Sequence, residues 1–363
     1  MRIVHITPTY FGNSSVIGGG ERYVAELASH MAKEAETTLV SFSARRDSYS
    51  ANGLKIELYP AKHFILGIRA NPLSFRYLAS IPSAGIVHIH QLNTLVSDMG
   101  CLLGRLIGKR TYVTDYGGGA GIVLNRMLPV MECYQAAFTY SGFGLSRLPE
   151  KLRKKAVLIR GGVDTDKFSP DPKLPREKKI IFVGRILPHK GINYLVEGFR
   201  LLNRSDFKLT ILGRVYDERF YQRLKELALG LRVEFVQGAD DTRLIQEYRT
   251  AYATVLPSVH TDCYGNYTPV PELMGFSVLE SQACGTPVIC SDAGAMKEFV
   301  EEGRTGLIAK QNSPEAIADA LRRLLELSAG EYREWEVRCR KFVEPLSWSS
   351  VVRQHLDLYT SSE

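Results

Sequence analysis

The sequence predicts an α/β protein made of two doubly wound domains, each a parallel sheet covered by helices. Its 363 residues are too many for one ordinary hydrophobic core and suit two domains of about 160 to 190 residues each. Short apolar runs alternate with helical patterns along nearly the whole chain, which is the order that parallel sheets require. A proline-rich stretch without periodicity, residues 168–175, indicates the region where the two domains join.

The expected strands are short runs rich in β-branched residues. In the first half they are residues 3–6, 38–41, 86–90 and 111–114, and in the second half residues 180–183, 209–212, 233–236, 253–256 and 287–290.

The expected helices follow from apolar spacing and from capping residues. Apolar side chains between Tyr23 and Met31 recur at helical spacing, and so do those between Ser347 and Tyr359. Ser313 before a proline predicts a capped helix start. We therefore expect an N-terminal domain over residues 1–165, a C-terminal domain over residues 166–345 and a final helix over residues 346–363.

Composition excludes some classes of protein. Apolar residues make up 45% of the chain, enough for two cores, yet every apolar window of about 20 residues is broken by charge, Gly or Pro. The first residues have the pattern of a strand and a turn, not of a signal peptide. The six cysteines show no CxxC pairing and are typical of reduced thiols. We expect a cytoplasmic protein, with peripheral attachment to the inner face of the membrane left open.

The net charge of +7 belongs to the first half of the chain. Residues 1–160 hold 19 Lys and Arg against 10 Asp and Glu, whereas residues 161–363 hold 27 against 29. No recognition helix, zinc finger or aromatic-basic strand pattern indicates nucleic acid. An anionic lipid surface or a phosphorylated acceptor fits better, and a basic surface kept for solubility stays open. In residues 62–69 cations flank an apolar patch, as in an interfacial segment or in a buried one with snorkelling ends.

Glu272 and Glu280 stand eight positions apart in the most informative stretch of the chain, with Gly275 between them. A glycine between two carboxylates indicates that the backbone approaches another group closely. Residues 278–284 have the pattern of a helix opening, and the N–H groups at a helix start attract anions. The carboxylates can then bind sugar hydroxyls while the helix start holds a phosphate. Taken alone, such glutamates can also be solvated charges or an acid at a helix N-terminus.

Arg185 and Lys190 follow the predicted strand that ends at Gly184. Two cations after a strand suit a diphosphate, because arginine can bind two oxygens as a fork and lysine acts as a mobile point charge. The alternative is surface charge on a loop. Open α/β sheets bind ligands at the carboxyl ends of their strands, which favours the binding interpretation.

Three glycines, Gly18, Gly19 and Gly20, lie between the first predicted strand and the first predicted helix. They allow the backbone to pack against a phosphate or sugar with its N–H groups pointing inward. The run does not match the GxGxxG pattern, which argues against dinucleotide binding. Simple turn glycines remain the alternative.

Together these elements resemble the retaining nucleotide-sugar glycosyltransferases of glycosyltransferase family 4, which have the GT-B fold. Glu272 and Glu280 match the family's Glu-x7-Glu signature, residues 184–191 its Gly-Arg…Lys-Gly element, and residues 18–22 its Gly-Gly-x-Glu-Arg loop. The resemblance extends from residue 18 to about residue 325 and is strongest in residues 180–310. It implies two Rossmann-like domains facing a central cleft, an N-terminal acceptor domain and a C-terminal domain for the nucleotide-sugar donor. It also implies that the final helix, residues 346–363, crosses back to the N-terminal domain.

The resemblance also implies a role for each matching residue. Glu272 would hold the donor-sugar hydroxyls and Glu280 the ribose hydroxyls, while Arg185 and Lys190 would neutralise the leaving diphosphate. Glu272, Arg185 and Lys190 are therefore the predicted catalytic residues. The other predicted donor-binding residues lie in the two glycine-containing loops: Gly275, Phe276, Ser277, Val278, Gly19 and Gly20.

One segment departs from the family pattern. Residues 113–119 align with a segment that often reads Thr-x-His-Gly, whose histidine lies near the donor sugar, and Tyr116 occupies that place. A tyrosine can still donate a hydrogen bond, but with a usual pKa of about 10 it is a poor base at neutral pH. We assign Tyr116, Asp115 and Gly18 to the acceptor or donor-sugar side. His88 and His90 lie on an apolar strand, where a core or cleft-edge histidine is the commoner outcome.

No metal and no cofactor are expected. No Asp-x-Asp box follows a strand, and Asp240 and Asp241 have the pattern of a capping pair before a helix. The resemblance implies metal-independent transfer from a UDP-, GDP- or ADP-sugar to a glycan or lipid-linked acceptor, with Arg185 and Lys190 in place of Mg²⁺. Two alternatives stay open: a nucleotide-sugar epimerase of the same fold, which needs no acceptor, and a catalytically silent nucleotide-sugar binding protein.

Overall fold

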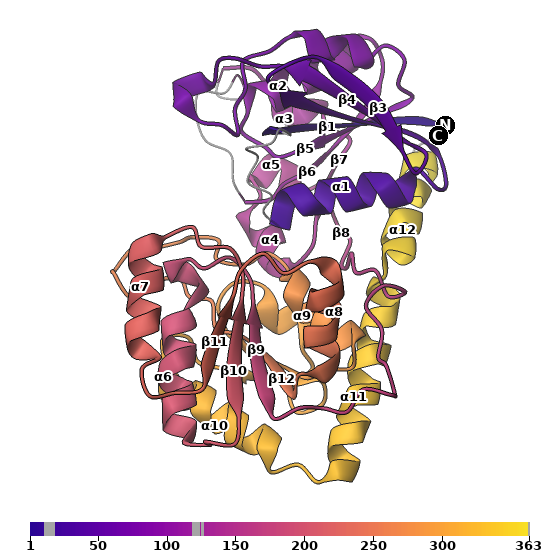
Figure 1. The fold of residues 1–363 in the computed structure, drawn as a ribbon. Helices are drawn as coiled ribbons and strands as arrows, with labels where there is room; N and C mark the ends of the chain where they lie inside the picture. Colours follow the sequence, from indigo (N-terminus) through magenta and orange to yellow (C-terminus); the bar gives the residue numbers. More distant parts are fainter. Residues whose placement is uncertain (11–18, 118–123, 125–126, 362–363) are drawn as a thin grey trace. The chain divides into compact units, whose positions relative to one another are not determined.

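The computed structural model describes residues 1–10, 19–117, 124 and 127–361 (Figure 1). They divide into two compact units, the first comprising residues 1–162 with 348–363 and the second residues 163–347. The predicted ligand residue Gly18 lies outside the described residues.

The first unit contains, among its described residues, an eight-stranded sheet in the order β3-β4-β2-β1-β5-β6-β7-β8. All neighbouring strands are parallel except β3 and β4. The strand order reverses between β1 and β5. Strands β2 to β4 lie on one side of β1, and strands β5 to β8 lie on the other side. The strands are β1 (Arg2–Tyr10), β2 (Glu36–Ser43), β3 (Asp47–Ala51), β4 (Leu54–Pro60), β5 (Ile86–His90), β6 (Arg110–Thr114), β7 (Ala136–Thr139) and β8 (Ala156–Leu158).

The helices of the first unit form where the sequence supplies an apolar stripe or a cap. The stripe predicted between Tyr23 and Met31 is buried, and α1 packs beside α12. The hydroxyl of Thr94 accepts the N–H of Ser97 and caps α2. The helices are α1 (Gly19–Met31), α2 (Leu95–Leu106), α3 (Val130–Cys133), α4 (Gly142–Arg147), α5 (Glu150–Arg153) and α12 (Trp348–Ser361), with short 3-10 turns η1 (Ile65–Gly67) and η2 (Arg76–Ser80).

The described residues of the second unit contain a six-stranded parallel sheet in the order β11-β10-β9-β12-β13-β14. Figure 1 shows α6, α7 and α10 on one side of this sheet and α8, α9 and α11 on the other. The strands are β9 (Lys179–Val183), β10 (Lys208–Leu212), β11 (Val233–Val236), β12 (Ala253–Leu256), β13 (Val288–Ser291) and β14 (Gly306–Ala309).

Local capping explains where several helices of the second unit begin. Asp240 accepts the N–H of Arg243, and Ser313 accepts the N–H of Ala316, so both predicted caps are confirmed. The helices are α6 (Ile192–Leu202), α7 (Glu218–Leu227), α8 (Asp241–Thr250), α9 (Phe276–Ala283), α10 (Pro314–Leu325) and α11 (Ala329–Val343), with 3-10 turns η4 (Pro188–Lys190), η5 (Met296–Phe299) and η6 (Glu344–Leu346).

The chain passes between the units at two neighbouring places, after Gly162 and before Trp348. A Cβ atom at Gly162 would stand 2.9 Å from the ring of Trp348, and Gly162 has a φ of 118°. On the other side of the division, Val163 forms a bridge with Ser347. The division therefore precedes the proline-rich residues 168–175, which lie inside the second unit.

Residues 62–69 form a surface loop of the first unit. The N–H of Ile65 donates to the carbonyl of Asn71 and that of Leu73 to the carbonyl of His63, both at 2.9 Å, so the loop folds back on itself. Leu66 at its tip is 69% exposed. The alternative of a buried segment with snorkelling ends is wrong. In the described part of the chain, no helix combines the length and the apolar character needed to cross a membrane.

Candidate functional site

The candidate site of the second unit lies at the carboxyl ends of β9 and β12. These neighbouring strands are the place where the strand order reverses, since β10 and β11 build out on one side and β13 and β14 on the other. Loops that leave two such strands diverge, and open α/β sheets bind their ligands in that opening. Lys190 follows β9 and Glu272 follows β12.

Lys190 and Glu272 form an ion pair in which both side chains are largely buried, 11% and 13% exposed. The hydroxyl of Ser258, two residues after β12, donates to the same carboxylate oxygen, Glu272 Oε1, at 3.0 Å. Charges that are poorly solvated interact more strongly than exposed ones. An anion that binds Lys190 must therefore compete with Glu272 for its ammonium group.

Close backbone contact places Lys190 at this position. A Cβ atom at Gly191 would stand 2.0 Å from the carbonyl oxygen of Pro257, and Gly191 has a φ of 65°. The N–H of Val259 also donates to the carbonyl of His189 at 2.8 Å. The turn η4 thus rests directly on the chain that leaves β12, and a glycine after the lysine is required for that contact.

The backbone of Glu272 is held by the loop that follows β13. The N–H of Ala295 donates to the carbonyl of Glu272 at 3.0 Å, and a Cβ atom at Gly294 would stand 2.4 Å from the same oxygen. Neither Gly294 nor Ser258 was singled out from the sequence. The signal available for both was their position shortly after a predicted strand, two residues beyond it for Ser258 and four for Gly294.

Arg185 lies one residue beyond Gly184 at the end of β9. Its guanidinium carbon is 5.8 Å from the centre of the Tyr216 ring, which is within the range of a cation–π contact. Arg185 is partly exposed. Gly184 is pressed against the neighbouring strand end, because a Cβ atom at Gly213 would stand 1.8 Å from the Gly184 carbonyl oxygen. Arg185 therefore projects from a crowded edge where two strand ends meet.

His189, which the sequence analysis did not single out, lies among the charged groups of this edge. Burial and then the adjacent Lys190 lower its pKa to about 4, with Arg185 acting in the same direction and Glu272 opposing. The charges of all three predicted catalytic residues therefore act on His189. Its imidazole is neutral at pH 7, so the cations of the site are Lys190 and Arg185.

Helix α9 begins immediately after Gly275, whose φ of 84° only a glycine adopts without strain. Phe276 and Ser277 are partly exposed in its first turn, which contains no acidic side chain that would neutralise the helix dipole. Val278 is buried, and its N–H donates to the carbonyl of Gly275 at 3.1 Å. The exposed part of this helix start is therefore Phe276 and Ser277.

Glu280 is placed differently from Glu272. It lies within α9, is 2% exposed, and its Oε2 accepts the hydroxyl of Tyr248 in α8 at 3.0 Å. The structure thus brings together Lys190, Glu272 and Ser258, whereas Glu280 belongs to the contact between two helices. Its binding to ribose stays a prediction.

In the first unit, the predicted residues Gly20, Asp115 and Tyr116 lie at one edge of the sheet. A Cβ atom at Gly20 would stand 3.2 Å from the Tyr116 ring, so the first turn of α1, which starts at Gly19, rests on this tyrosine. Asp115 accepts the N–H of Leu92 at 3.0 Å and that of Gly117 at 3.1 Å. Burial raises the pKa of Asp115 above its usual value, because it outweighs these backbone hydrogen bonds, which lower the pKa. Its carboxylate thereby holds two loops together.

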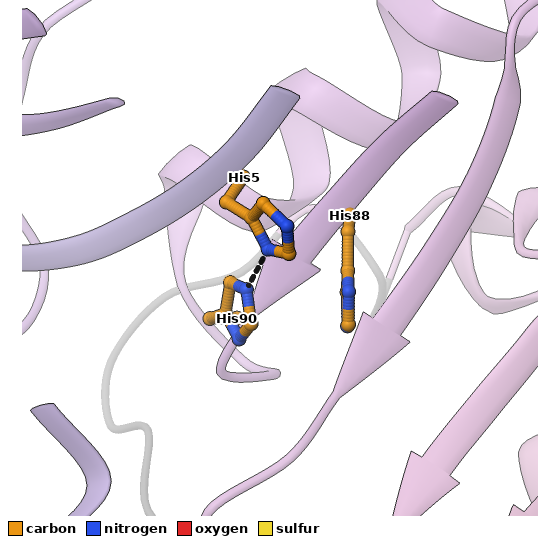
Figure 2. Close-up of side chains that lie close together, drawn as sticks. All are labelled: His5, His88 and His90. Carbon is orange, nitrogen blue, oxygen red and sulfur yellow. Dashed lines mark hydrogen bonds between the residues drawn. The ribbon is translucent and has the colours of Figure 1, made fainter. Parts of the chain in front are cut away.

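Tyr116 is bonded to a buried cluster of three histidines, His5, His88 and His90, which Figure 2 shows. The Tyr116 hydroxyl is 2.6 Å from His90 Nδ1, and His90 Nε2 is 2.9 Å from His5 Nδ1. His88 stacks on His90 with ring centres 4.3 Å apart. All three histidines are fully buried, and burial lowers the pKa of each, that of His5 to about 3. They are neutral core groups at pH 7.

Comparison with known proteins gives a family match for the second unit. Residues 164–341 match the family described as glycosyl transferases group 1. This range covers nearly the whole of the second unit and includes Arg185, Lys190, Glu272 and Glu280.

Two relatives match about half of this chain. An uncharacterized glycosyltransferase of Methanocaldococcus jannaschii is 32% identical over 188 residues, which cover 50% of this chain and 45% of that protein. A D-inositol 3-phosphate glycosyltransferase of Acidothermus cellulolyticus is 31% identical over 199 residues, which cover 49% and 41% respectively. The chain therefore spans less than half the length of these relatives.

The crystal structure of Anabaena HepE in complex with UDP and glucose resembles the whole chain. Its TM-score is 0.74 at 15% identity, and the likeness covers 99% of this chain and 100% of that one. A likeness at this level of identity shows the fold. The expected fold class of two Rossmann-like α/β domains, the GT-B type, is confirmed.

Proposed function

We propose that the protein is a retaining, metal-independent glycosyltransferase that moves a sugar from a nucleoside-diphosphate sugar to a hydroxyl of a glycan or lipid-linked acceptor. The observation that carries the proposal is the ion pair of Lys190 and Glu272 at the reversal of strand order. It lies within residues that match the group 1 glycosyltransferases. The complex of the structurally similar Anabaena protein with UDP-glucose supports a nucleotide-sugar donor.

Lys190 and Glu272 are suited to exchange partners when a donor binds. The diphosphate carries more negative charge than a single carboxylate and can attract the Lys190 ammonium away from Glu272. Glu272 would then accept hydrogen bonds from donor-sugar hydroxyls while Ser258 continues to hold one of its oxygens. One local rearrangement would thus provide both halves of the donor site.

The same groups can stabilise the leaving diphosphate. As the bond between the anomeric carbon and the phosphate oxygen breaks, its electron pair and a negative charge pass to that oxygen. Lys190, Arg185 and the start of α9 supply positive potential there, as fixed donors do in other transferases. The acceptor oxygen forms the new bond on the face that the phosphate leaves, and its proton passes to the leaving phosphate. The anomeric configuration is therefore retained.

A thermal-shift screen followed by product analysis tests this function. A nucleoside diphosphate at 100 times its dissociation constant adds about 2.7 kcal/mol to the free energy of unfolding, so UDP, GDP and ADP can be ranked. The matching sugar nucleotide is then incubated with candidate glycans and lipid-linked glycans, and the products are examined by NMR. Acceptor-dependent release of the nucleotide with a retained anomer is expected, whereas an isomerised donor without acceptor would indicate an epimerase.

Two controls sharpen this experiment. Lys178→Ala removes an exposed lysine of the same unit, one that pairs only at the surface with Asp206, and should leave transfer unchanged. Lys190→Gln should abolish most of it. Absence of stabilisation by all three nucleotides, together with no turnover, would contradict the proposal.

We further propose that the first unit docks on an anionic membrane that carries the acceptor. The surface loop exposes Leu66 by 69%, and two apolar residues that follow the loop, Leu73 and Phe75, are 43% and 52% exposed. Exposed cations, Lys62 and Arg69, flank the first of these residues. Each cation near an anionic surface contributes about 1 kcal/mol, and salt screens the effect.

Liposome flotation tests the docking. Wild-type protein should float with vesicles that contain phosphatidylglycerol at low salt and should sink at high salt. Leu66→Asp should abolish flotation, whereas Leu229→Asp, at a leucine of the second unit that is 71% exposed, should not. Sinking of the wild type with anionic vesicles at low salt would point to a soluble acceptor.

A further inference from the structure

The histidine cluster of the first unit uses all six of its ring nitrogens in hydrogen bonds. His5 and His90 bond to each other, and their outer nitrogens lie 3.2 Å from Met31 Sδ and 2.6 Å from the Tyr116 hydroxyl respectively. His88 is bonded to Thr114 at 2.7 Å and to Tyr359 at 2.6 Å. Figure 2 shows the bonded pair, with the His88 ring standing beside it.

The direction of the chain of hydrogen bonds follows from its inner end. A thioether sulfur has no proton, so His5 Nε2 must carry the proton that it shares with Met31. A neutral imidazole has a single N–H, and burial lowers the pKa of His5 to about 3. His5 Nδ1 is therefore an acceptor, and the proton between His5 and His90 belongs to His90 Nε2.

The same reasoning applied to His90 reaches Tyr116. His90 is also buried and neutral, so its one proton on Nε2 leaves Nδ1 as an acceptor. The partner of Nδ1 is the Tyr116 hydroxyl, which must donate its only proton. Burial raises the pKa of Tyr116, so this proton is retained at pH 7. From the sequence, Tyr116 could donate this proton to a ligand, but in the structure the proton is committed to His90.

We propose that His90 is a positioning residue that fixes the Tyr116 oxygen as a hydrogen-bond acceptor, through which the protein recognises a hydroxyl group of a sugar substrate. This inference rests on the proposed glycosyl transfer. Tyr116 is partly exposed as a residue, lies beside the first turn of α1, and stands two residues beyond the end of β6. Its hydroxyl bonds to the buried His90, and the Tyr140 side chain is a second hydrogen-bonding neighbour, which a sugar hydroxyl has to displace to reach the oxygen. The Tyr116 oxygen can accept a hydrogen bond from a hydroxyl group of the sugar. It cannot donate one, so it binds a group that can only accept less well.

A metal site is the competing interpretation of the same cluster. One ligand atom from each of His5, His88 and His90 lies within 4.8 Å of the others. A cation there would have to displace the proton between His5 and His90 and one partner of His88. The set of ligand atoms also contains no carboxylate that would offset the charge of a buried divalent ion. The hydrogen-bonded arrangement satisfies every nitrogen without these costs.

The first experiment reads the protons directly and does not depend on catalysis. Long-range ¹H–¹⁵N spectra of protein labelled in histidine distinguish the two neutral tautomers. His5 and His90 should both carry their proton on Nε2, and Tyr116→Phe should shift the Nδ1 resonance of His90. A proton on Nδ1 of His90, or zinc bound stoichiometrically after dialysis against it, would overturn the proposal.

The second experiment measures recognition of the hydroxyl. Donor and acceptor sugars that carry fluorine in place of one hydroxyl can accept but not donate a hydrogen bond. At one sugar position, replacement of the hydroxyl by fluorine should lower kcat/KM about tenfold more in the wild type than in Tyr116→Phe. This position can belong to the donor sugar or to the acceptor sugar. The electronic effect of fluorine on the reaction is the same in both proteins and cancels. Equal falls at every position in both series would overturn the proposal.

Variants of the histidines complete the test. His90→Leu should lose discrimination between the hydroxyl and the fluorine substrate as Tyr116→Phe does. The double variant His90→Leu/Tyr116→Phe should show no further loss. His90→Asn, which offers an oxygen near the place of Nδ1, should restore discrimination in part. His88→Leu is the matched control, because His88 is equally buried on the same strand but does not bond to Tyr116. If His88→Leu abolishes discrimination as fully as His90→Leu, the cluster is only structural.

These outcomes separate the two claims. Expected tautomers with normal discrimination in His90→Leu would refute the positioning role while transfer stands. Expected tautomers in a protein that transfers no sugar would refute the proposed function instead.

Discussion

The two units place different chemistry at equivalent points of the same fold. In both sheets the first strand lies in the middle and the strand order reverses beside it. In the second unit this point holds the ion pair of Lys190 and Glu272, which is largely buried but not fully enclosed, at 11% and 13% exposure. In the first unit the strands beside it, β1 and β5, carry His5, His88 and His90, fully buried and neutral.

The difference shows how one topology can serve two purposes. An ion pair at a partly open edge can exchange one partner for an anionic ligand, because another charge can replace the one that leaves. In the histidine cluster all ring nitrogens already have neutral hydrogen-bond partners, so the cluster cannot exchange a partner for an anionic ligand. It can only orient the side chain at its end, Tyr116. The second unit is therefore suited to bind phosphate, and the first to position a polar side chain.

The largest expected contrast is in acid stability. His5, His88, His90 and His355 are fully buried in the first unit, and burial lowers the pKa of each, to about 3 for His5 and about 4 for His355. Below the unfolded pKa of about 6.5 the unfolded chain binds more protons, so stability falls as the pH drops from about 6.5 towards these values. The slope is about 1.4 kcal/mol per pH unit for each such histidine.

Single-tryptophan variants measure this contrast, because the chain has two tryptophans, Trp348 in the first unit and Trp335 in the second. Denaturation midpoints of Trp335→Phe report on the first unit and those of Trp348→Phe on the second. Between pH 7 and pH 4.5 the first unit should lose more stability. Midpoints are preferred to intensities because His30 stacks on Trp348. Parallel loss in both units would mean that the buried histidines are not the cause.

The charged edge of the second unit should dominate turnover. In the proposed reaction, Lys190→Ala and Arg185→Ala would each remove a cation from the leaving diphosphate. We therefore expect a cost of roughly 2.7–4 kcal/mol in the activation barrier, by analogy with the loss of an oxyanion donor. Steady-state rates measure the effect. Lys190→Gln keeps a hydrogen-bond donor for Glu272 and checks that the loss is not one of folding. Rates within threefold of wild type in either alanine variant would remove that residue from the site.

A smaller effect is expected from the contact that places Lys190. Gly191→Ala should destabilise the protein by about 1–3 kcal/mol more than Gly265→Ala, measured by denaturant unfolding. Both glycines have positive φ, but an added Cβ meets the Pro257 carbonyl only at Gly191, since nothing lies within 4 Å at Gly265. The difference in stability between the two variants therefore measures the clash with the Pro257 carbonyl, because both variants carry the strain of a positive φ. Equal destabilisation would show that η4 does not rest on the Pro257 carbonyl, just beyond β12.

The sequence predicted most of the fold because its signals are local. Strand runs such as 86–90, 233–236 and 253–256 coincide with β5, β11 and β12, since each is a short β-branched run between turn residues. The caps at Asp240 and Ser313 are equally local.

The site was less predictable because its contacts join distant parts of the chain. Lys190 and Glu272 were assigned to different parts of the donor, and their pairing depends on the adjacency of β9 and β12. Glu280 faces Tyr248, which a helical pattern alone could not reveal. The proton of Tyr116 is directed by Met31 through two histidines that come from separate strands. No spacing in the sequence encodes that chain.

Calorimetric titration of UDP, GDP and ADP into wild type, Lys190→Gln and Glu272→Gln tests whether a diphosphate takes Lys190 away from Glu272. A hydrogen bond to a charged group contributes about 1.5–3 kcal/mol, so Lys190→Gln should bind the preferred nucleotide about 10- to 100-fold more weakly. Glu272→Gln should bind it at least as tightly as wild type, because the carboxylate no longer competes for Lys190. Wild-type affinity in Lys190→Gln, or an equal loss in both variants, would contradict the exchange of partners on which the account depends.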